Sequence, residues 1–413
     1  MNFKEKVSHL ECDTCFRRFM PGEVELTCPE CGPDLGTLTV NYHYDRIKDV
    51  LTPGALADNR EPSHWRYLDI LPVSTRPESL HPRVGWTPLY HLPGLGLGDL
   101  WIKDDGVNPS ASFKDRASSV GVARAVEEGR SVITAASTGN AASSVSLFAA
   151  CAGMRAVIFV PETAPEAKLA QLLIFGAEVL SVRGTYDQAF DLCLQTALER
   201  GWYCRNTAVN PYLGEGKKTA ALEICEQLGF DPPDRVFVSV GDGCIIGGLW
   251  KGFLDFKRLG LIDRLPRLYG VQAAGSAPLV RAFEKGDRVA TPLREVSTCA
   301  DSICVGQPRD HIKALRAVYE SRGAMLAVED EEILTAMRRL AREAGIFAEP
   351  AGAAGFAGLC RLASKSEIDP QERVVVLVTG NGLKDVPTAI SAVDRRPTPV
   401  DANVEAIRSV LTQ

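Results

Sequence analysis

The chain has 413 residues, of which 45% are hydrophobic and 24% are charged, and it carries a net charge of −6; this is typical of a globular protein with two or three domains. The net negative charge argues against nucleic acid as the partner, and no apolar run approaches the roughly 18 residues that a membrane span needs. Because the N-terminus also lacks the hydrophobic stretch of a signal peptide, we expect a cytoplasmic enzyme that uses no membrane.

Two Cys-x-x-Cys pairs near the N-terminus are the first pattern along the chain. They are Cys12 with Cys15 and Cys28 with Cys31. Four thiolates at this spacing can close a tetrahedron around zinc, which makes a structural rather than a catalytic site. The alternatives are two redox-active dithiols or unrelated thiols. We expect a zinc ribbon over residues 1–45.

The next stretch, residues 41–84, is rich in proline and predicts either a segment that wraps around the rest of the chain or a linker, with little local structure. The aromatic and basic residues at 64–67 are its expected anchor. A short apolar strand is then predicted at 100–103, followed by a Pro/Ser turn and a helix.

Lys114 stands at the start of that helix. A hydroxyl group of Ser110 or Ser112 could accept from the first N–H groups and so cap the helix. The partial positive charge of a helix N-terminus disfavours an ammonium and lowers the pKa of the lysine, and a neutral amine can form a Schiff base. The alternative is a solvated lysine in a first turn.

From residue 131 onward, apolar strands alternate with helical patterns, which predicts an α/β protein with parallel sheets. The expected strands are 131–135, 155–160, 178–182, 202–205, 235–240, 267–272 and 373–378. The expected helices are 167–175, 186–200, 214–228, 329–343 and 351–362, with two more that follow the turns at 136–142 and 241–248.

Three strand ends carry small polar or glycine residues, and ligands gather at the carboxyl ends of parallel strands. The glycines at 241–248 suit a phosphate at a helix N-terminus, although their spacing fits neither the dinucleotide pattern nor a Walker loop. The acid inside this loop, Asp242, must point away from a phosphate or cap a neighbouring group. The other two strand ends carry Asn140 and Thr379.

Taken alone, the turn at Asn140 and the strand end at Thr379 are more readily turns than sites. Together with Lys114 and the glycines at 241–248, they supply an amine for an imine, a loop for a phosphate, an amide for a phenolic oxygen and a hydroxyl for a ring nitrogen. This is the equipment that pyridoxal phosphate needs.

Four segments then resemble a known family. They are SFKDR at 112–116, STGN at 137–140, EPA at 349–351 and TGNGLKD at 379–385. The chain resembles the fold-type II pyridoxal-phosphate enzymes and, within them, the threonine synthase family, over roughly residues 84–390. Related members also carry an N-terminal zinc ribbon.

The resemblance implies an α/β fold of the tryptophan synthase β type, with two open parallel-sheet domains beside the ribbon. The large cofactor-binding domain would span 46–104 and 201–400, and the small domain 105–200. The fold type also suggests a homodimer.

The resemblance further implies roles for single residues. Lys114 would hold the cofactor as an imine and act as acid and base, Asn140 would bond the ring oxygen, and Thr379 would meet the ring nitrogen. The backbone of Gly241, Asp242, Gly243, Cys244 and Ile245 would hold the phosphate. The substrate would contact Ser137, Thr138 and Gly139, with Lys103, Ser110 and Asn206 as further polar contacts.

The family converts O-phosphohomoserine to threonine, so we expect a carbon–oxygen lyase that acts on an amino acid. Leu213 stands where the family usually carries an arginine, and Ala141 where threonine is common. Losing an arginine weakens the claim on a phosphorylated substrate. The alternatives are a threonine or serine dehydratase-like deaminase, and a β- or γ-replacement enzyme for a non-standard amino acid. A nucleic-acid module on an inactive scaffold is disfavoured by the intact lysine motif.

Overall fold

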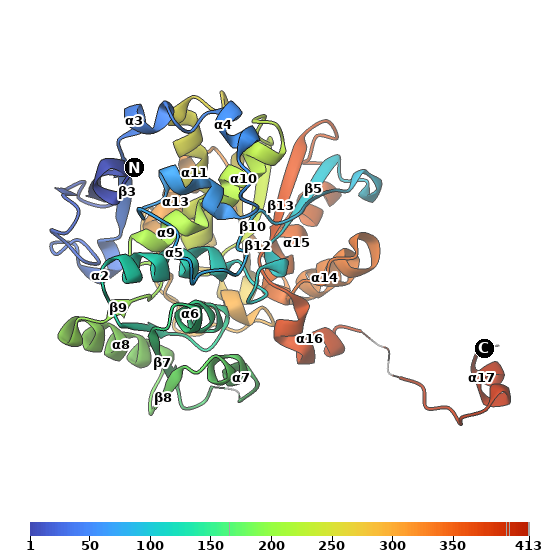
Figure 1. Ribbon diagram of the computed structural model, residues 1–413. Coiled ribbons are helices and arrows are strands. Elements are labelled where there is room, and N and C mark those ends of the chain that lie inside the picture. Colours follow the sequence, from blue (N-terminus) through green and yellow to red (C-terminus); the bar gives the residue numbers. More distant parts are fainter. Residues whose placement is uncertain (165, 394, 396, 412–413) are drawn as a thin grey trace.

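The chain folds around three β-sheets (Figure 1). The computed structural model describes residues 1–164, 166–393, 395 and 397–411. Residues 394 and 396, which fall within the range predicted for the large domain, lie outside the described residues. Each sheet, with the helices packed against it, forms a distinct part of the molecule.

The largest sheet has six strands in the order β12-β11-β10-β13-β5-β4. In chain order they are β4 (Leu89–His91), β5 (Asp99–Asp104), β10 (Arg235–Ser239), β11 (Arg267–Ala273), β12 (Ala324–Val328) and β13 (Arg373–Val378). All neighbours are parallel except β4, which runs antiparallel to β5. The last strand in the sequence, β13, therefore lies in the interior of the sheet, between β10 and β5.

Helices cover both faces of this sheet. One face carries α10 (Thr219–Gln227), α11 (Cys244–Leu259), α12 (Pro278–Lys285) and α13 (His311–Glu320), and the other carries α14 (Asp330–Ala344) and α15 (Pro350–Ser364). Val236 and Val238 of β10 pack into the first layer, whereas Phe237 packs into the second. A strand buried on both faces needs a continuous apolar run, which is the pattern that the sequence shows at 235–240 and 373–378.

The small sheet has four parallel strands in the order β8-β7-β6-β9. They are β6 (Val132–Ala136), β7 (Arg155–Pro161), β8 (Glu178–Val182) and β9 (Tyr203–Cys204). Helices α6 (Asn140–Cys151) and α7 (Glu166–Ile174) pack on one face, and α8 (Tyr186–Arg200) packs on the other. Because β9 pairs with β6, the small sheet extends past the boundary that we predicted at residue 200.

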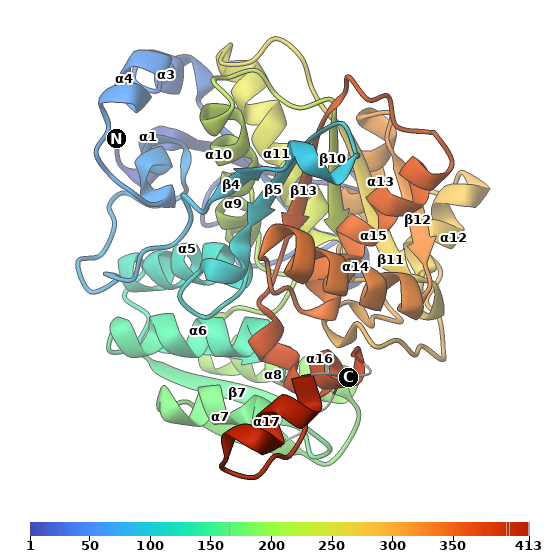
Figure 2. The same ribbon diagram turned by 90° about the vertical axis from the view of Figure 1, so that its right-hand side faces the viewer.

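Helix α5 (Lys114–Glu127) lies where the two domains meet, between α6 and α9 (Tyr212–Lys217), as Figure 2 shows. The predicted helix at 214–228 is present as α9 followed by α10. Lys218 joins them with helical backbone angles, so the helical stretch begins only two residues earlier than predicted.

The N-terminal sheet is a three-stranded antiparallel ribbon in the order β2-β1-β3. Its elements are α1 (Phe3–Lys6), β1 (Val7–Cys12), β2 (Arg18–Phe19), α2 (Gly32–Leu35) and β3 (Leu38–Tyr42). The ribbon packs against α13, where Arg316 pairs with Asp13 at 2.6 Å and Lys313 donates to the carbonyl of Leu38 at 2.7 Å.

The segment at 41–84 wraps around the large domain as predicted, and it contains α3 (Tyr44–Lys48), α4 (Pro53–Asp58) and the 3₁₀ helix η1 (His64–Ile70). Residues 64–67 of η1 are buried and anchor the segment. Arg66 and Tyr67 both bond Glu226 of α10, with N–O and O–O distances of 2.5 and 2.6 Å.

The remaining elements are short 3₁₀ turns and two C-terminal helices. They are η2 (Pro93–Leu95), η3 (Asp105–Val107), η4 (Ala274–Ser276), η5 (Asp301–Ile303), η6 (Gly382–Asp385), α16 (Val386–Ser391) and α17 (Val404–Leu411). Helix α17 stands apart from both domains (Figure 1). Across the described residues, every helix is too short or too polar to cross a membrane.

Candidate active site

Lys114 is the first residue of α5 and is held beside the end of β13. The N–H of Phe113 donates to the carbonyl of Thr379 at 2.8 Å, and the N–H of Asn381 donates to the carbonyl of Ala111 at 3.0 Å. These two bonds join the lysine loop to the carboxyl end of the central strand. Segments far apart in the sequence therefore meet at one edge of the sheet, as predicted.

The predicted helix cap is wrong. Phe113 occupies the N-cap position of α5, and no side chain caps the first turn. Ser110 instead donates from its hydroxyl to Asp115 at 2.5 Å, and the same carboxylate accepts the backbone N–H of Ser110 at 2.6 Å. The acid at the second helical position takes both donors, so these bonds brace the turn before the helix.

The pKa of the Lys114 amine is lowered, as the sequence predicted, and burial is the largest cause. The positive charges of Lys217 and Arg205 act in the same direction, whereas Glu349 opposes it. The predicted direction is confirmed, but its causes are burial and neighbouring charges rather than the helix N-terminus on which the prediction rested.

The glycine loop joins β10 to α11. Gly243 has a φ of +99°, and a Cβ there would lie 2.7 Å from the Cβ of Ala314, so only glycine fits. No side chain caps α11, which leaves its first N–H groups available to an anion. Asp242 turns aside, since its carboxylate accepts the N–H of Arg309 at 3.1 Å. The expectation that this acid would cap a neighbouring group is confirmed.

Two cavities meet at Lys114. The smaller, of about 60 Å³, is lined by the loop from Gly241 to Ile246, by Thr379 and by Glu349. The larger, of about 580 Å³, is lined by Ser137, Thr138, Gly139 and Asn140 from the turn that opens α6. Lys114 lines both. The structure thus brings the predicted lysine, loop, hydroxyl and amide to one place.

Thr379 directly follows β13 and lines the smaller cavity. The hydroxyl of Ser239, at the end of β10, lies 3.4 Å from that of Thr379. Adjacent parallel strands place these two side chains together, and the sequence had singled out only Thr379.

Glu349 is a site residue to which the sequence had given no role. It is the N-cap residue of α15, and its Oε1 accepts from the amide of Asn140 at 2.9 Å. Burial raises the pKa of Glu349 to about 7, against the opposing effect of Lys114 and Lys384. An acid directly before a proline that opens an apolar helix is a signal that could have found it.

Three predicted substrate contacts lie elsewhere. Each of Lys103, Ser110 and Asn206 is fully buried and lines neither cavity. The ammonium of Lys103 bonds Glu223 at 2.7 Å, and Asn206 accepts the N–H of Ala136 at 2.7 Å. These polar groups are already paired within the protein, so we do not retain them as substrate ligands.

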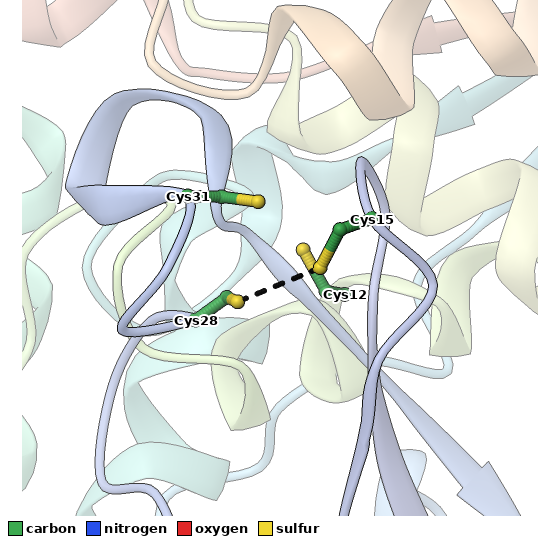
Figure 3. A group of neighbouring side chains, drawn as sticks. All are labelled: Cys12, Cys15, Cys28 and Cys31. Carbon is green, nitrogen blue, oxygen red and sulfur yellow. Dashed lines mark hydrogen bonds between the residues drawn. The ribbon is translucent and has the colours of Figure 1, made fainter.

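The four N-terminal thiols converge, as Figure 3 shows. The sulfurs of Cys12, Cys15, Cys28 and Cys31 all lie within 4.8 Å of one another. Each pair sits in a similar turn: the N–H of Phe16 donates to the carbonyl of Cys12 at 3.0 Å, and the N–H of Gly32 donates to the carbonyl of Cys28 at 2.9 Å. Four thiols at these distances could hold one metal ion.

Comparison with known proteins extends the geometric findings. The family model described as "Pyridoxal-phosphate dependent enzyme" matches residues 80–380. The chain is 41% identical to the threonine synthase of Methanocaldococcus jannaschii, over 97% of this chain and 99% of that protein. It is 40% identical to the threonine synthase of Methanosarcina acetivorans, over 98% of each.

Solved structures give the same fold at lower identity. Threonine deaminase isoform 2 from Solanum lycopersicum has a TM-score of 0.63 and 23% identity, and the match covers 75% of this chain and 88% of that chain. Maize serine racemase has a TM-score of 0.63 and 20% identity, over 74% of this chain and 91% of that chain. Likeness at this level of identity shows the fold alone, and it confirms the predicted fold type.

Proposed function

This chain belongs to the threonine synthase family of pyridoxal-phosphate-dependent enzymes, and from that premise we propose that it converts O-phosphohomoserine and water into threonine and inorganic phosphate. Such an enzyme is a carbon–oxygen lyase of amino-acid biosynthesis. The observation that carries the proposal is the 41% identity to a threonine synthase over nearly the full length of both chains. A small-molecule amino acid is accordingly the substrate.

The residues around the smaller cavity fit pyridoxal phosphate. A phosphate suits the uncapped N-terminus of α11, where Gly243 leaves no room for a side chain. Lys114 lies within the same cavity wall as Thr379, so an amine and a neutral hydroxyl are both available to the cofactor ring. A hydroxyl rather than a carboxylate suits a ring nitrogen that stays largely unprotonated.

When bound, the cofactor withdraws electrons from the α-carbon of the amino acid. Lys114 would be the covalent anchor and would then move the proton at Cα, a task helped by its lowered pKa. The amide of Asn140 would bind the ring oxygen, and the N–H groups from Gly241 to Ile245 would hold the cofactor phosphate. The hydroxyl of Thr379 would bind the ring nitrogen.

The turn that opens α6 suits the substrate carboxylate. Ser137, Thr138 and Gly139 line the larger cavity and precede a helix N-terminus, where backbone N–H groups and the helix dipole favour an anion. Glu349 lines the smaller cavity and Asn140 the larger one, and the amide of Asn140 donates a hydrogen bond to the carboxylate of Glu349. That bond restricts rotation of the Asn140 amide, which would help to orient it when the cofactor is bound.

The thiols of Cys12, Cys15, Cys28 and Cys31 support a structural Zn²⁺ site. A closed set of four thiolates leaves no open position, so its role is to hold the ribbon rather than to catalyse. The enzyme acts in the cytoplasm as a homodimer in this proposal, without nucleic acid or membrane.

The test is an assay of purified protein with O-phosphohomoserine, in which released phosphate and threonine are both measured. L-Threonine and L-serine, assayed in parallel for 2-oxo acid, test the dehydratase alternative. Equal amounts of phosphate and threonine support the proposal. Formation of 2-oxo acid without any threonine would contradict it and favour a deaminase.

A Lys114→Ala variant tests the role of the anchor. We expect turnover to fall to the background rate, because the covalent link and the proton carrier are lost together. The four-cysteine ribbon lies outside the site, so its metal content and the folded state should be unchanged. Undiminished threonine formation by this variant would overturn the assignment of Lys114.

A further inference from the structure

Two buried cations line the smaller cavity without an acidic partner. They are Arg205, which follows β9, and Lys217, the last residue of α9. Their exposed fractions are 1% and 4%. Within the described residues, no carboxylate oxygen lies within ion-pair distance of either side chain, although the buried cations of Lys103, Arg116 and Lys218 all have such partners.

Arg205 has spare hydrogen-bonding capacity inside the protein. Its Nε donates to the hydroxyl of Ser118 at 3.2 Å, but its Nη2 is buried and has no acceptor among the described residues. Burial lowers the pKa of Arg205 to about 10, so the guanidinium is still charged at neutral pH. A buried charge with an unused donor is costly unless something pairs with it.

Lys217 differs from the lysine that follows it. Lys218 is fully buried and paired, with its ammonium 2.5 Å from Glu215 and 2.8 Å from Asp255. Lys217 packs against the first turns of α11. A Cβ added to Gly248 of that helix would lie 2.8 Å from the Cβ of Lys217. It also borders a second cavity of about 150 Å³ beneath the ribbon.

Both cations therefore reinforce the positive end of α11. Lys217 and Arg205 line the same cavity as Lys114, so their charge lies near its amine, and both help to lower the pKa of that amine. The acid of the loop does not neutralise them, since Asp242 already accepts the N–H of Arg309. A helix N-terminus with two unpaired cations suits a doubly charged phosphate better than a carboxylate.

Leu213, at the position where the family usually carries an arginine, brings no charge to the N-terminus of α11. The residue is buried, and its side chain packs at the position where Gly121 of α5 leaves room. Lys217 stands one helical turn after it on α9, so the same helix carries a cation at a different position. A phosphate group can therefore be bound without an arginine at residue 213.

We propose that Arg205 and Lys217 together bind a phosphate monoester at the N-terminus of α11. The proposal rests on the proposed function, because that function supplies two such groups, one on the cofactor and one on the substrate. The two sources share their chemistry, and the experiment separates them.

The experiment first strips purified protein of cofactor and titrates it with pyridoxal phosphate and with pyridoxal, which lacks the phosphate. The variants are Arg205→Gln and Lys217→Gln, with Arg205→Lys and Lys217→Arg as conservative replacements. Lys218→Gln is the matched control, because it removes a neighbouring buried lysine that is already paired. We expect Lys218→Gln to lower the melting temperature. The ratio of the dissociation constants for pyridoxal and pyridoxal phosphate should stay as in wild type.

If the cofactor is the source, each glutamine variant weakens pyridoxal phosphate binding about 10- to 100-fold, the loss expected for one charge-assisted hydrogen bond. Binding of pyridoxal stays within about twofold, and the conservative variants recover part of the loss. If the substrate is the source, cofactor binding is unchanged, while KM for O-phosphohomoserine and the inhibition constant of inorganic phosphate rise by a similar factor.

Unchanged binding of cofactor, substrate and inorganic phosphate in both glutamine variants would overturn the proposal. Failure of the proposed function has a different signature. In that case the wild-type protein forms no threonine, yet the ratio of the pyridoxal and pyridoxal phosphate constants still shows whether these cations bind a phosphate.

Discussion

At the scale of single residues, the site is set by buried groups whose partners come from distant parts of the chain. Lys114 and Thr379 could be predicted from the sequence, because each follows a recognisable strand or turn within a motif. Arg205 and Lys217 could not, since nothing in their local sequence shows that they lack an acidic partner. Lys103 and Asn206 were wrongly predicted to contact the substrate for the same reason: their local sequence does not show that each already has a partner within the protein.

The raised pKa of Glu349 predicts a pH dependence of stability in the cofactor-free protein. The folded state holds the proton up to about pH 7, whereas the ordinary pKa of the group is 4.5. Folding stability should therefore fall as the pH rises from about 4.5 to about 7, by roughly 1–3 kcal/mol, and level off above that.

A Glu349→Gln variant should lose this part of the pH dependence. Urea unfolding of the cofactor-free proteins between pH 4.5 and 8 measures it, and the difference between wild type and variant isolates the one group. If the unfolding free energies of wild type and variant change in parallel with pH over the whole range, Glu349 does not titrate there.

At the scale of elements, the regular α/β stretch was predicted closely. The strand at 178–182, the helix at 186–200 and the strand at 373–378 have the predicted bounds, because each shows a clear period and ends at turn residues. Strand β12 was missed. It is a short edge strand of only five residues, Ala324–Val328, and edge strands carry the weakest hydrophobic pattern.

The arginine of the lysine motif joins three elements rather than binding a ligand. Arg116 of α5 pairs with Asp105 and with Glu223 of α10, both with N–O distances of 2.5 Å, and Glu223 also holds Lys103 of β5. All four side chains are fully buried, and Arg116 and Lys103 lower the pKa of Glu223. The network therefore fixes α5, and with it the position of Lys114, against the large domain.

An Arg116→Met variant should lose roughly 3–5 kcal/mol of unfolding free energy, because two carboxylates would be left buried without their partner. Chemical denaturation measures the loss. The matched control is Arg155→Gln, which breaks an exposed pair with Glu178 and should leave the denaturation midpoint close to that of wild type. A similar effect of the two substitutions would contradict the structural importance of the buried network.

At the scale of the whole molecule, the ribbon is connected to the glycine loop between β10 and α11. Asp13 pairs with Arg316 of α13, and Asp34 of the ribbon pairs with Arg309 at 3.1 Å. The backbone N–H of Arg309 donates to Asp242 inside the glycine loop. A disturbance of the four-cysteine site can thus reach the loop through a short series of contacts.

Removal of the proposed metal should consequently weaken the proposed cofactor site. We expect a Cys28→Ser variant, or chelation of the metal, to lower the melting temperature and to raise the dissociation constant of pyridoxal phosphate by about tenfold. A Cys151→Ser variant controls for loss of a thiol elsewhere. Cofactor binding that is identical with and without metal would show that the ribbon and the loop are independent.

The position of β13 also bears on how the protein is made. This strand is synthesised after the other five strands of its sheet, yet it must insert between β10 and β5. Until residue 378 has left the ribosome, the two halves of the large sheet have no common neighbour, and their inner edges offer unpaired backbone groups. Long-range pairing of this kind folds slowly and exposes the chain to aggregation. A nascent chain would therefore gain most from a chaperone in the interval just before its C-terminal region emerges.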